Sequence, residues 1–174
     1  MAKPCPDPID CTDTYGRLQI DGWSLQGPAW CAYDLGDLYG SSNFAGDNWV
    51  VEDRPGAIAQ PLLCAETTYS LPMVFSGAVN REGTPWANPA GGLIANRRSF
   101  EDRFITPIRT GTASLAAILD VPDPDDPEGW IPLAIDVQPL RLSWQFTPEA
   151  YGRGVLTLRV PECGILTVEP DEGE

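Results

Sequence analysis

The sequence predicts a mainly β protein: an antiparallel β-sandwich or barrel with one flanking α-helix. Apolar and polar side chains alternate without interruption from Leu140 to Thr147, which is typical of a half-buried strand. A second alternating run at residues 156–160 follows a short connection, so the two runs are expected to pair antiparallel. Apolar residues recur at helical spacing at Leu93, Phe100 and Phe104, which predicts a helix near residues 92–105.

Short strands and turns are predicted before the helix. Residues 1–16 are rich in proline and favour an extended arm. A strand at 18–20 ends at Asp21-Gly22, a dipeptide that readily takes the positive φ values of a hairpin turn. Further strands are expected at 31–35, 48–52 and 62–75, separated by the loop 36–46 and the Pro55-Gly56 turn. Pro72 must lie at an edge or a bulge, because proline has no N–H for a strand ladder.

The second half of the chain is predicted to be β-rich. A loop at 80–92 leads into the helix, and Pro107 is expected to end it. A strand at 113–119 precedes the acidic, proline-punctuated segment 120–129, which is not expected inside a helix or a sheet. The remaining β segments are expected at 130–137 and 163–168, before an acidic tail at 169–174. Residues 17–168 are therefore predicted to form one domain.

The overall charge limits the classes of partner. The net charge of the 174 residues is −14, and such a surface repels duplex phosphate and anionic membranes. The basic residues are ten arginines and one lysine. Guanidinium groups suit protein interfaces, which favours an assembly subunit, although a GC-rich coding bias explains the same composition.

The cysteines indicate reduced structural thiols. The five cysteines lie at positions 5, 11, 31, 64 and 163, with no C-x2-C pair and no histidine to complete a zinc site. A bridge between Cys5 and Cys11 is the alternative. No apolar leader segment and no run of eighteen apolar residues occurs, so a soluble protein made in the cytoplasm is expected.

The residue inventory argues against an enzyme, so no catalytic, cofactor-binding or metal-binding residue is predicted. Without histidine, the chain lacks Ser-His-Asp and Cys-His chemistry and most catalytic zinc sites. It also lacks the G-x-S-x-G, phosphate-loop and G-x-G-x-x-G motifs. A carboxylate pair remains an option. However, twelve of the twenty-five acids fall in the arm, the segment 120–129 and the tail, where solvation opposes the raised pKa that a general acid needs.

Two binding alternatives are open. Asp120, Asp123, Asp125 and Asp126 could supply oxygens to Ca²⁺, but the EF-hand pattern is absent and a solvated acidic loop is the preferred interpretation. Six tryptophans invite a carbohydrate-binding interpretation, since sugars stack on exposed indoles. Most of them are assigned to the core or to subunit contacts: Trp144 is expected to be buried, and Trp86, in a Gly/Pro-rich loop, is the best exposed candidate.

The order of strand, turn and helix signals from Leu18 to Pro107 adds a resemblance. The segments that carry it are Ile20-Asp21-Gly22, Ser24-Leu25, Trp30, Asp34-Leu35, Pro55-Gly56, Leu71-Pro72-Met73 and Gly83-Thr84-Pro85. This succession resembles the minor or distal tail proteins of long-tailed (siphovirus) phages, particularly those of actinobacterial hosts. It covers about half of the chain.

The resemblance implies a phage tail-tube-like fold and a structural subunit in the virion tail, assembled in the host cytoplasm. The expected partners are further copies of the chain, in a ring that is a hexamer in this family, and other tail proteins. DNA is expected to pass through the ring without binding. The arm 1–16 and the loops 36–46 and 80–92 are expected to contact neighbours. The major tail tube protein and a carbohydrate- or receptor-binding β-sandwich are the alternatives; a C-terminal galectin-like domain is not implied.

Overall fold

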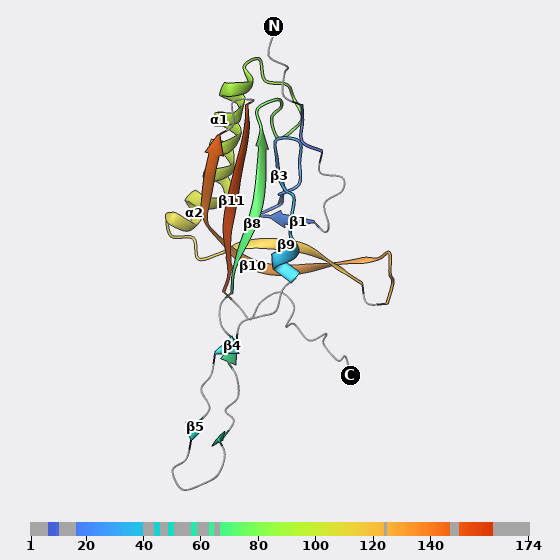
Figure 1. Cartoon of the computed structure of the whole chain (residues 1–174), viewed down its shortest axis with the longest axis vertical. Helices are drawn as coiled ribbons and strands as arrows, with labels where there is room; N and C mark the ends of the chain where they lie inside the picture. The colour runs from blue at the N-terminus through green and yellow to red at the C-terminus, as the bar shows by residue number, and fades with distance from the viewer. Residues whose placement is uncertain are drawn as a thin grey trace.

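The main body of the protein is one antiparallel sheet of seven strands, curled into a half-barrel, with a helical layer packed on one face (Figure 1). The computed structural model describes residues 7–10, 17–39, 44–45, 49–50, 57–58, 63–64, 67–123, 125–146 and 150–161. The mainly β class, the antiparallel sheet and the flanking helix are confirmed, and the sheet takes the barrel form, left open.

The strand order in the main sheet is β2-β1-β9-β10-β11-β8-β3. Its strands are β1 (Leu18–Ile20), β2 (Trp23–Ser24), β3 (Trp30–Ala32), β8 (Thr67–Ser76), β9 (Leu115–Pro122), β10 (Trp130–Phe146) and β11 (Tyr151–Val160). Two small antiparallel pairs lie apart from it in Figure 1: β4 (Phe44–Ala45) with β7 (Leu63–Cys64), and β5 (Trp49–Val50) with β6 (Ala57–Ile58). The helical segments are η1 (Gly36–Tyr39), α1 (Pro89–Phe100), η2 (Glu101–Ile105) and α2 (Thr106–Arg109).

The turn between β1 and β2 follows directly from its sequence. Asp21 has φ 48° and Gly22 has φ 77°, so both central residues take the left-handed values that a tight hairpin turn requires. Ile20 then pairs with Trp23 across the hairpin. The turn predicted at Asp21-Gly22 is confirmed.

Strand β10 is bent and belongs to two ladders. Its first half, to Val137, pairs with β9, whereas its second half, from Gln138, pairs with β11. The register with β11 shifts between Pro139 and Arg141, and the β9–β10 hairpin crosses the direction of β8 and β11 in Figure 1. The predicted antiparallel pairing of the last two runs is confirmed. The uninterrupted apolar face expected from Leu140 is wrong at its first residue, because the bulge leaves Leu140 exposed.

The helix is longer than predicted at both ends. It begins at Pro89, because the Asn88 side chain accepts a hydrogen bond from the Gly91 N–H and proline suits the first helical position. The loop predicted at 80–92 therefore ends at residue 88. Pro107 does not end the helix: residues 101–105 form a π turn, in which the Thr106 N–H donates to the Glu101 carbonyl. The helix reaches Arg109 because the wider turn accommodates a residue that lacks an N–H.

Three further predictions concern the part of the chain between β3 and the acidic segment. The strand predicted at 31–35 is limited to β3, and η1 lies within the predicted loop. Pro72 lies at an edge as predicted: the Tyr33 N–H donates to the Pro72 carbonyl, so the Pro72 nitrogen faces the side where β3 ends. The segment 120–129 was expected outside any sheet, which is wrong for residues 120–122, because they pair with β10.

Some expectations fall on other parts of the chain. Within the arm, the Ile9 N–H donates to the Pro28 carbonyl, and the Asp7 carbonyl accepts from the hydroxyls of Ser76 and Tyr151. This short piece therefore lies against its own sheet. The rest of the arm, the Pro55-Gly56 turn, the strand at 163–168 and the acidic tail lie outside the described residues.

Aromatic side chains join the helix to the sheet. The Phe100 ring, fully buried, lies 5.5 Å from Trp30, 5.3 Å from Phe75 and 4.7 Å from Phe104, measured between ring centroids. All of these pairs are edge-on or steeply inclined, the arrangement in which each contributes roughly 0.5–1.5 kcal/mol beyond its buried area. Phe100 is thus the centre of the core.

A buried amide and two glycines bring the start of the helix close to the end of β8. Asn96, 2% exposed, donates from its side-chain amide to the carbonyls of Ser76 and Val79, both at 2.7 Å. A side chain on Gly77 would collide with the backbone of Pro89, and a Cβ on Gly92 would lie 2.5 Å from Cγ of Trp86 and 2.7 Å from the Gly77 carbonyl oxygen. The helix can pack here because both positions lack a side chain.

Gly92→Ala is expected to lower the free energy of unfolding by about 1–3 kcal/mol, because the new methyl group overpacks a site bounded by backbone. Gly91→Ala is the matched control. Its Cβ would meet only the Asn88 side chain, the nearest atom at 3.3 Å, and alanine favours the helix. Urea unfolding checks both, and equal midpoints for the two variants would contradict the close approach.

Cys31 corrects the expectation of reduced thiols, because it is disulfide-bonded. Cys31 itself is 1% exposed on β3, in the interior of the fold. The odd number of cysteines had favoured free thiols. An odd number excludes only the pairing of all five cysteines, and it does not exclude a single disulfide.

Reduction of the Cys31 disulfide is expected to lower the free energy of unfolding by about 2–4 kcal/mol, since a cross-link restricts the unfolded chain. Urea unfolding with and without dithiothreitol measures this, with reduction confirmed by the mass of the alkylated protein. Cys31→Ala, which cannot form the bond, is expected to show no response to the reductant. A fully reduced wild-type protein with an unchanged midpoint would exclude a stabilising bond.

Candidate interaction surface

The acidic segment shapes the tip of the β9–β10 hairpin. The Asp123 carboxylate accepts the Asp125 N–H at 2.8 Å, and the Asp126 carboxylate accepts the Glu128 N–H at 3.1 Å. Asp120 lies back in β9, paired with Pro132. In the part of the chain that the structure describes, no group of three or more His, Cys, Asp or Glu side chains is placed to hold a metal ion. Asp123 and Asp126 thus order the turn through local hydrogen bonds.

The tryptophans differ in exposure from the prediction. Trp86 is 37% exposed, and its ring lies against Gly92 while its indole N–H donates to Asn96 at 3.3 Å. Trp130, at 45%, is more exposed. Trp144 is half-buried, not fully buried, and packs edge-on against Phe75.

Trp23 is the centre of a cluster of cations and rings. The guanidinium carbons of Arg81 and Arg103 lie 4.0 Å and 4.9 Å from the centroid of its ring. Trp30 stacks on it nearly parallel, with centroids 6.2 Å apart. Arg103 also binds the Asp21 carboxylate at 2.7 Å and the Asp21 carbonyl at 2.9 Å. The cluster therefore connects the β1–β2 turn, the loop before α1 and the π turn.

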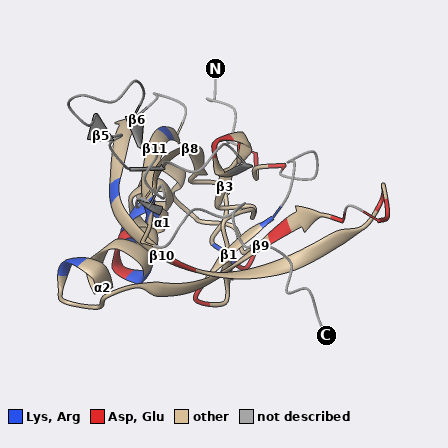
Figure 2. Ribbon diagram, turned by 90° about the horizontal axis from the view of Figure 1, so that it is seen from below, with Lys and Arg blue, Asp and Glu red and all other residues tan. Residues whose placement is uncertain are grey.

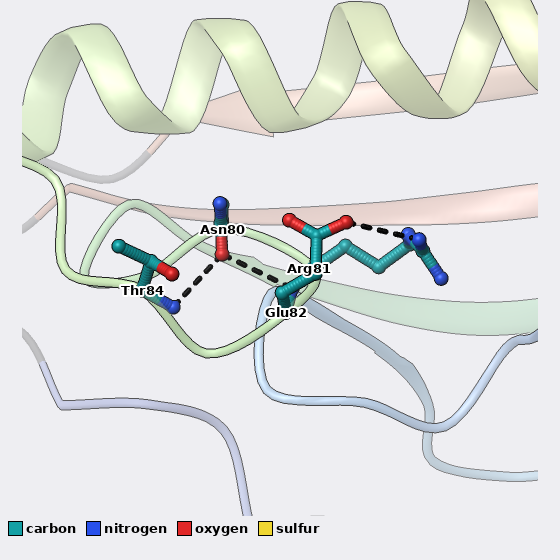
Figure 3. Close-up of polar contacts among 4 residues, drawn as sticks. All are labelled: Asn80, Arg81, Glu82 and Thr84. Atoms are coloured by element: carbon teal, nitrogen blue, oxygen red, sulfur yellow. Dashed lines mark hydrogen bonds and ion pairs between the residues drawn. The ribbon is translucent and has the colours of Figure 1, made fainter.

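The loop that carries Arg81 is ordered by one side chain (Figure 3). The Asn80 carboxamide oxygen accepts the N–H groups of Glu82 at 3.0 Å and Thr84 at 2.8 Å, and Glu82 pairs with Arg81 at 2.9 Å. Gly83 takes the positive φ of 83° that the turn requires. A cleft of about 140 Å³ beside this loop is lined by Ser24, Gln26, Gly27, Pro28, Ala29, Trp30 and Arg81. The guanidinium groups of Arg81 and Arg103 both bind carboxylates of the same chain, so we assign a structural role to this cluster.

Sequence reasoning missed this cluster because its members are far apart in the chain. Trp23, Arg81 and Arg103 share no local spacing, and they meet only when β1, the loop and the helix have packed. The expected contact loop 80–92 is thus held against its own body.

The β9–β10 hairpin exposes several large apolar side chains of the described part of the chain. We call residues 118–134 the hairpin arm; in Figure 1 it extends sideways from the body. Ile118 is 44% exposed, Trp130 45% and Ile131 42%. Trp130 and Ile131 are consecutive in a strand, so they point to opposite faces. The arm therefore presents exposed apolar side chains on both faces, which is uncommon in monomeric proteins.

One edge of the arm has no strand beside it within the described ranges. The Asp120 N–H donates to Arg17 and the Ala116 carbonyl accepts from Asp21, so these alternate residues of β9 direct their backbone groups toward β1. The residues between them in β9 direct their backbone groups toward β10. Pro132, Ala134 and Asp136 of β10 lie opposite the residues that face β1, so their own backbone groups point away from β9. Pro132 offers no N–H there, as expected for proline on an exposed edge.

Comparison of the chain with protein-family models, with curated proteins and with solved structures finds no match. No helix among the described residues has the length and apolar character needed to cross a membrane.

Arg103→Gln is expected to lower the free energy of unfolding by about 1–2 kcal/mol, because it removes the contact with Trp23 and the pair with Asp21. Arg98→Gln, on the same helical segment, is the control. The Arg98 side chain is 83% exposed, and its ion pair with Asp102 is long, at 3.6 Å. Loss of this weak pair is expected to lower the free energy of unfolding by under about 0.5 kcal/mol. Thermal unfolding compares them, and similar losses would show that the Trp23 cluster contributes little.

Proposed function

We propose that the protein is a structural subunit of a long-tailed phage tail, a minor or distal tail protein that forms a ring around the DNA conduit. The observation that carries the proposal is the hairpin arm, which combines exposed apolar side chains on both faces with a strand edge that no described strand covers. A partner that covers the arm would bury this surface at about 25 cal/mol for each Å² of apolar area removed from water.

The position of the arm allows head-to-tail contacts between copies. The arm extends from one side of the body, so the surface that receives it on a neighbour differs from the arm itself. Such head-to-tail contacts produce closed rings when the rotation between subunits closes. The resemblance to tail proteins leads us to expect a β-sandwich with one flanking helix, and the proposal is supported by the mainly β class and the flanking helix, while the sheet itself is a half-barrel.

The net charge is consistent with this role. A chain of net charge −14 repels DNA phosphates, so DNA could slide past the ring without binding. Disulfides are rare in the cytosol and persist outside the cell. If subunits assemble in the host cytoplasm, the Cys31 bond would form once the particle has been released. The major tail tube protein of the same particle shares these arguments and is the nearest alternative.

A carbohydrate- or receptor-binding β protein is the second candidate, and the partly exposed indoles of Trp86 and Trp130 favour it. A glycan array separates the two proposals, since binding that is lost in Trp86→Ala or Trp130→Ala would support the lectin. The tail proposal expects no glycan signal.

Negative-stain images and light scattering of the purified full chain are expected to show rings. Ile131→Ser, in the arm, is expected to shift the equilibrium toward monomers without changing the thermal midpoint by more than a few degrees. Ile94→Ser on α1 removes an isoleucine that is 58% exposed and is expected to leave the rings intact. A wild-type protein that remains monomeric at high concentration would overturn the proposed function.

A further inference from the structure

The tip of the hairpin arm carries carboxylates that no described residue of the same chain neutralises. The tip acids are Asp123, Asp125, Asp126 and Glu128, all on the turn that joins β9 to β10. Within the described residues none of them forms an ion pair, and the side chains of Asp125 and Glu128 are exposed. The tip is therefore a concentrated negative charge at the end of an apolar arm.

The outer face of β10 and β11 carries the complementary charge. Leu142 and Leu156 face the core, so Arg141, one position before Leu142, and Arg153, three positions before Leu156, face outward. Both arginines are exposed, and neither forms an ion pair with a described residue. Val155, 37% exposed, lies between their positions on this face. We call Arg141, Arg153 and Val155 the arginine face.

The tip cannot reach the arginine face of its own chain. Trp130 and Arg141 lie on the same strand, eleven positions apart, which corresponds to about 36 Å if the strand were straight. The bend in β10 does not bring them together: Figure 2 shows the acidic tip at one extreme of the molecule and the β11 and α2 side at the other. Both charges are left for a partner.

We infer that the hairpin arm of one copy docks on the arginine face of the next copy. This inference rests on the proposed self-assembly and names the surfaces that form it. The apolar side chains of the arm would cover Val155 and its surroundings, while the tip acids approach Arg141 and Arg153. The contact is head-to-tail, so repetition can close a ring.

The charges and the apolar side chains have different roles in this contact. Pairs of exposed charges contribute only about 0–1 kcal/mol each, so burial of Ile131 and Trp130 supplies most of the affinity. The charges fix the orientation of the arm on the neighbouring copy and increase the rate of association. Repulsion between like charges also disfavours an arrangement in which the acidic tips of two copies meet. Salt weakens these exposed pairs, since the screening length is about 8 Å at physiological ionic strength.

Charge reversal tests the contact on the full-length protein. A tip variant carries Asp125→Arg and Glu128→Arg, and a face variant carries Arg141→Glu and Arg153→Glu. Each is expected to raise the concentration for half-assembly by at least tenfold while the thermal midpoint stays unchanged. Their equimolar mixture is expected to assemble again with the two chains in a 1:1 ratio, as is the chain with all four changes. A control with Arg98→Glu and Arg109→Glu makes the same charge change on the helix and is expected to assemble normally.

The outcomes separate the inference from the proposed function. If the wild-type protein forms rings and both charge variants form them equally well, the arm does not dock on the arginine face, although the tail subunit proposal stands. If the variants dissociate but their mixture stays monomeric, direct pairing of the two surfaces is excluded. If the wild-type protein never self-associates, the proposed function itself fails. Light scattering of the wild type at low and high salt gives a readout free of mutations, and assembly that is insensitive to salt would contradict the charge pairing.

Discussion

The double pairing of β10 is the constraint on which the rest of the molecule depends. The same strand closes the hairpin with β9 and the ladder with β11, and it changes register between Pro139 and Arg141. Because the backbone is continuous through the bend, the orientation of the arm relative to the body is fixed by strand geometry and not by a flexible loop. A rigid arm can bind a partner at low entropic cost, which suits the assembly with a defined rotation that we propose.

Packing behind the sheet keeps this strand in place. Phe104 and Ile105 of η2 are buried in the core, and η2 and α2 both pack against β10. The helix reaches the sheet because Gly77 and Gly92 allow backbone to approach backbone. Asn96 satisfies the carbonyls that this approach buries, so the helix is held by a specific polar contact as well as by apolar packing.

Local signals in the sequence predicted the parts of the fold that depend on few residues. The Asp21-Gly22 turn and the pairing of the last two strands follow from turn chemistry and alternation, and both are present. The exposure of Leu140 was not predictable from alternation, because a bulge reverses the facing of residues without changing their pattern. Pro107 was taken as a helix end, since nothing in the sequence marks a π turn before it.

Surface features formed by residues far apart in the chain could not be predicted from the sequence. The Trp23 cluster and the edge at Pro132, which no described strand covers, depend on the order of strands in the sheet, and no local motif specifies that order. The acidic segment was identified correctly as charged, but its place at the tip of an apolar arm required the register between β9 and β10. The Cys31 bond was missed because counting cysteines says nothing about which of them are close in space.

The π turn before Pro107 also bears on how this chain could vary. A π turn holds one more residue than the α-helical turn that it replaces, so it resembles an insertion retained within a helix. The wide turn takes up this residue locally, so the helical residues on either side keep their orientation, and Phe100 and Phe104 both lie in the core. Loss of one residue within 101–105 is therefore expected to convert the π turn into an α-helical turn while α2 stays packed against β10.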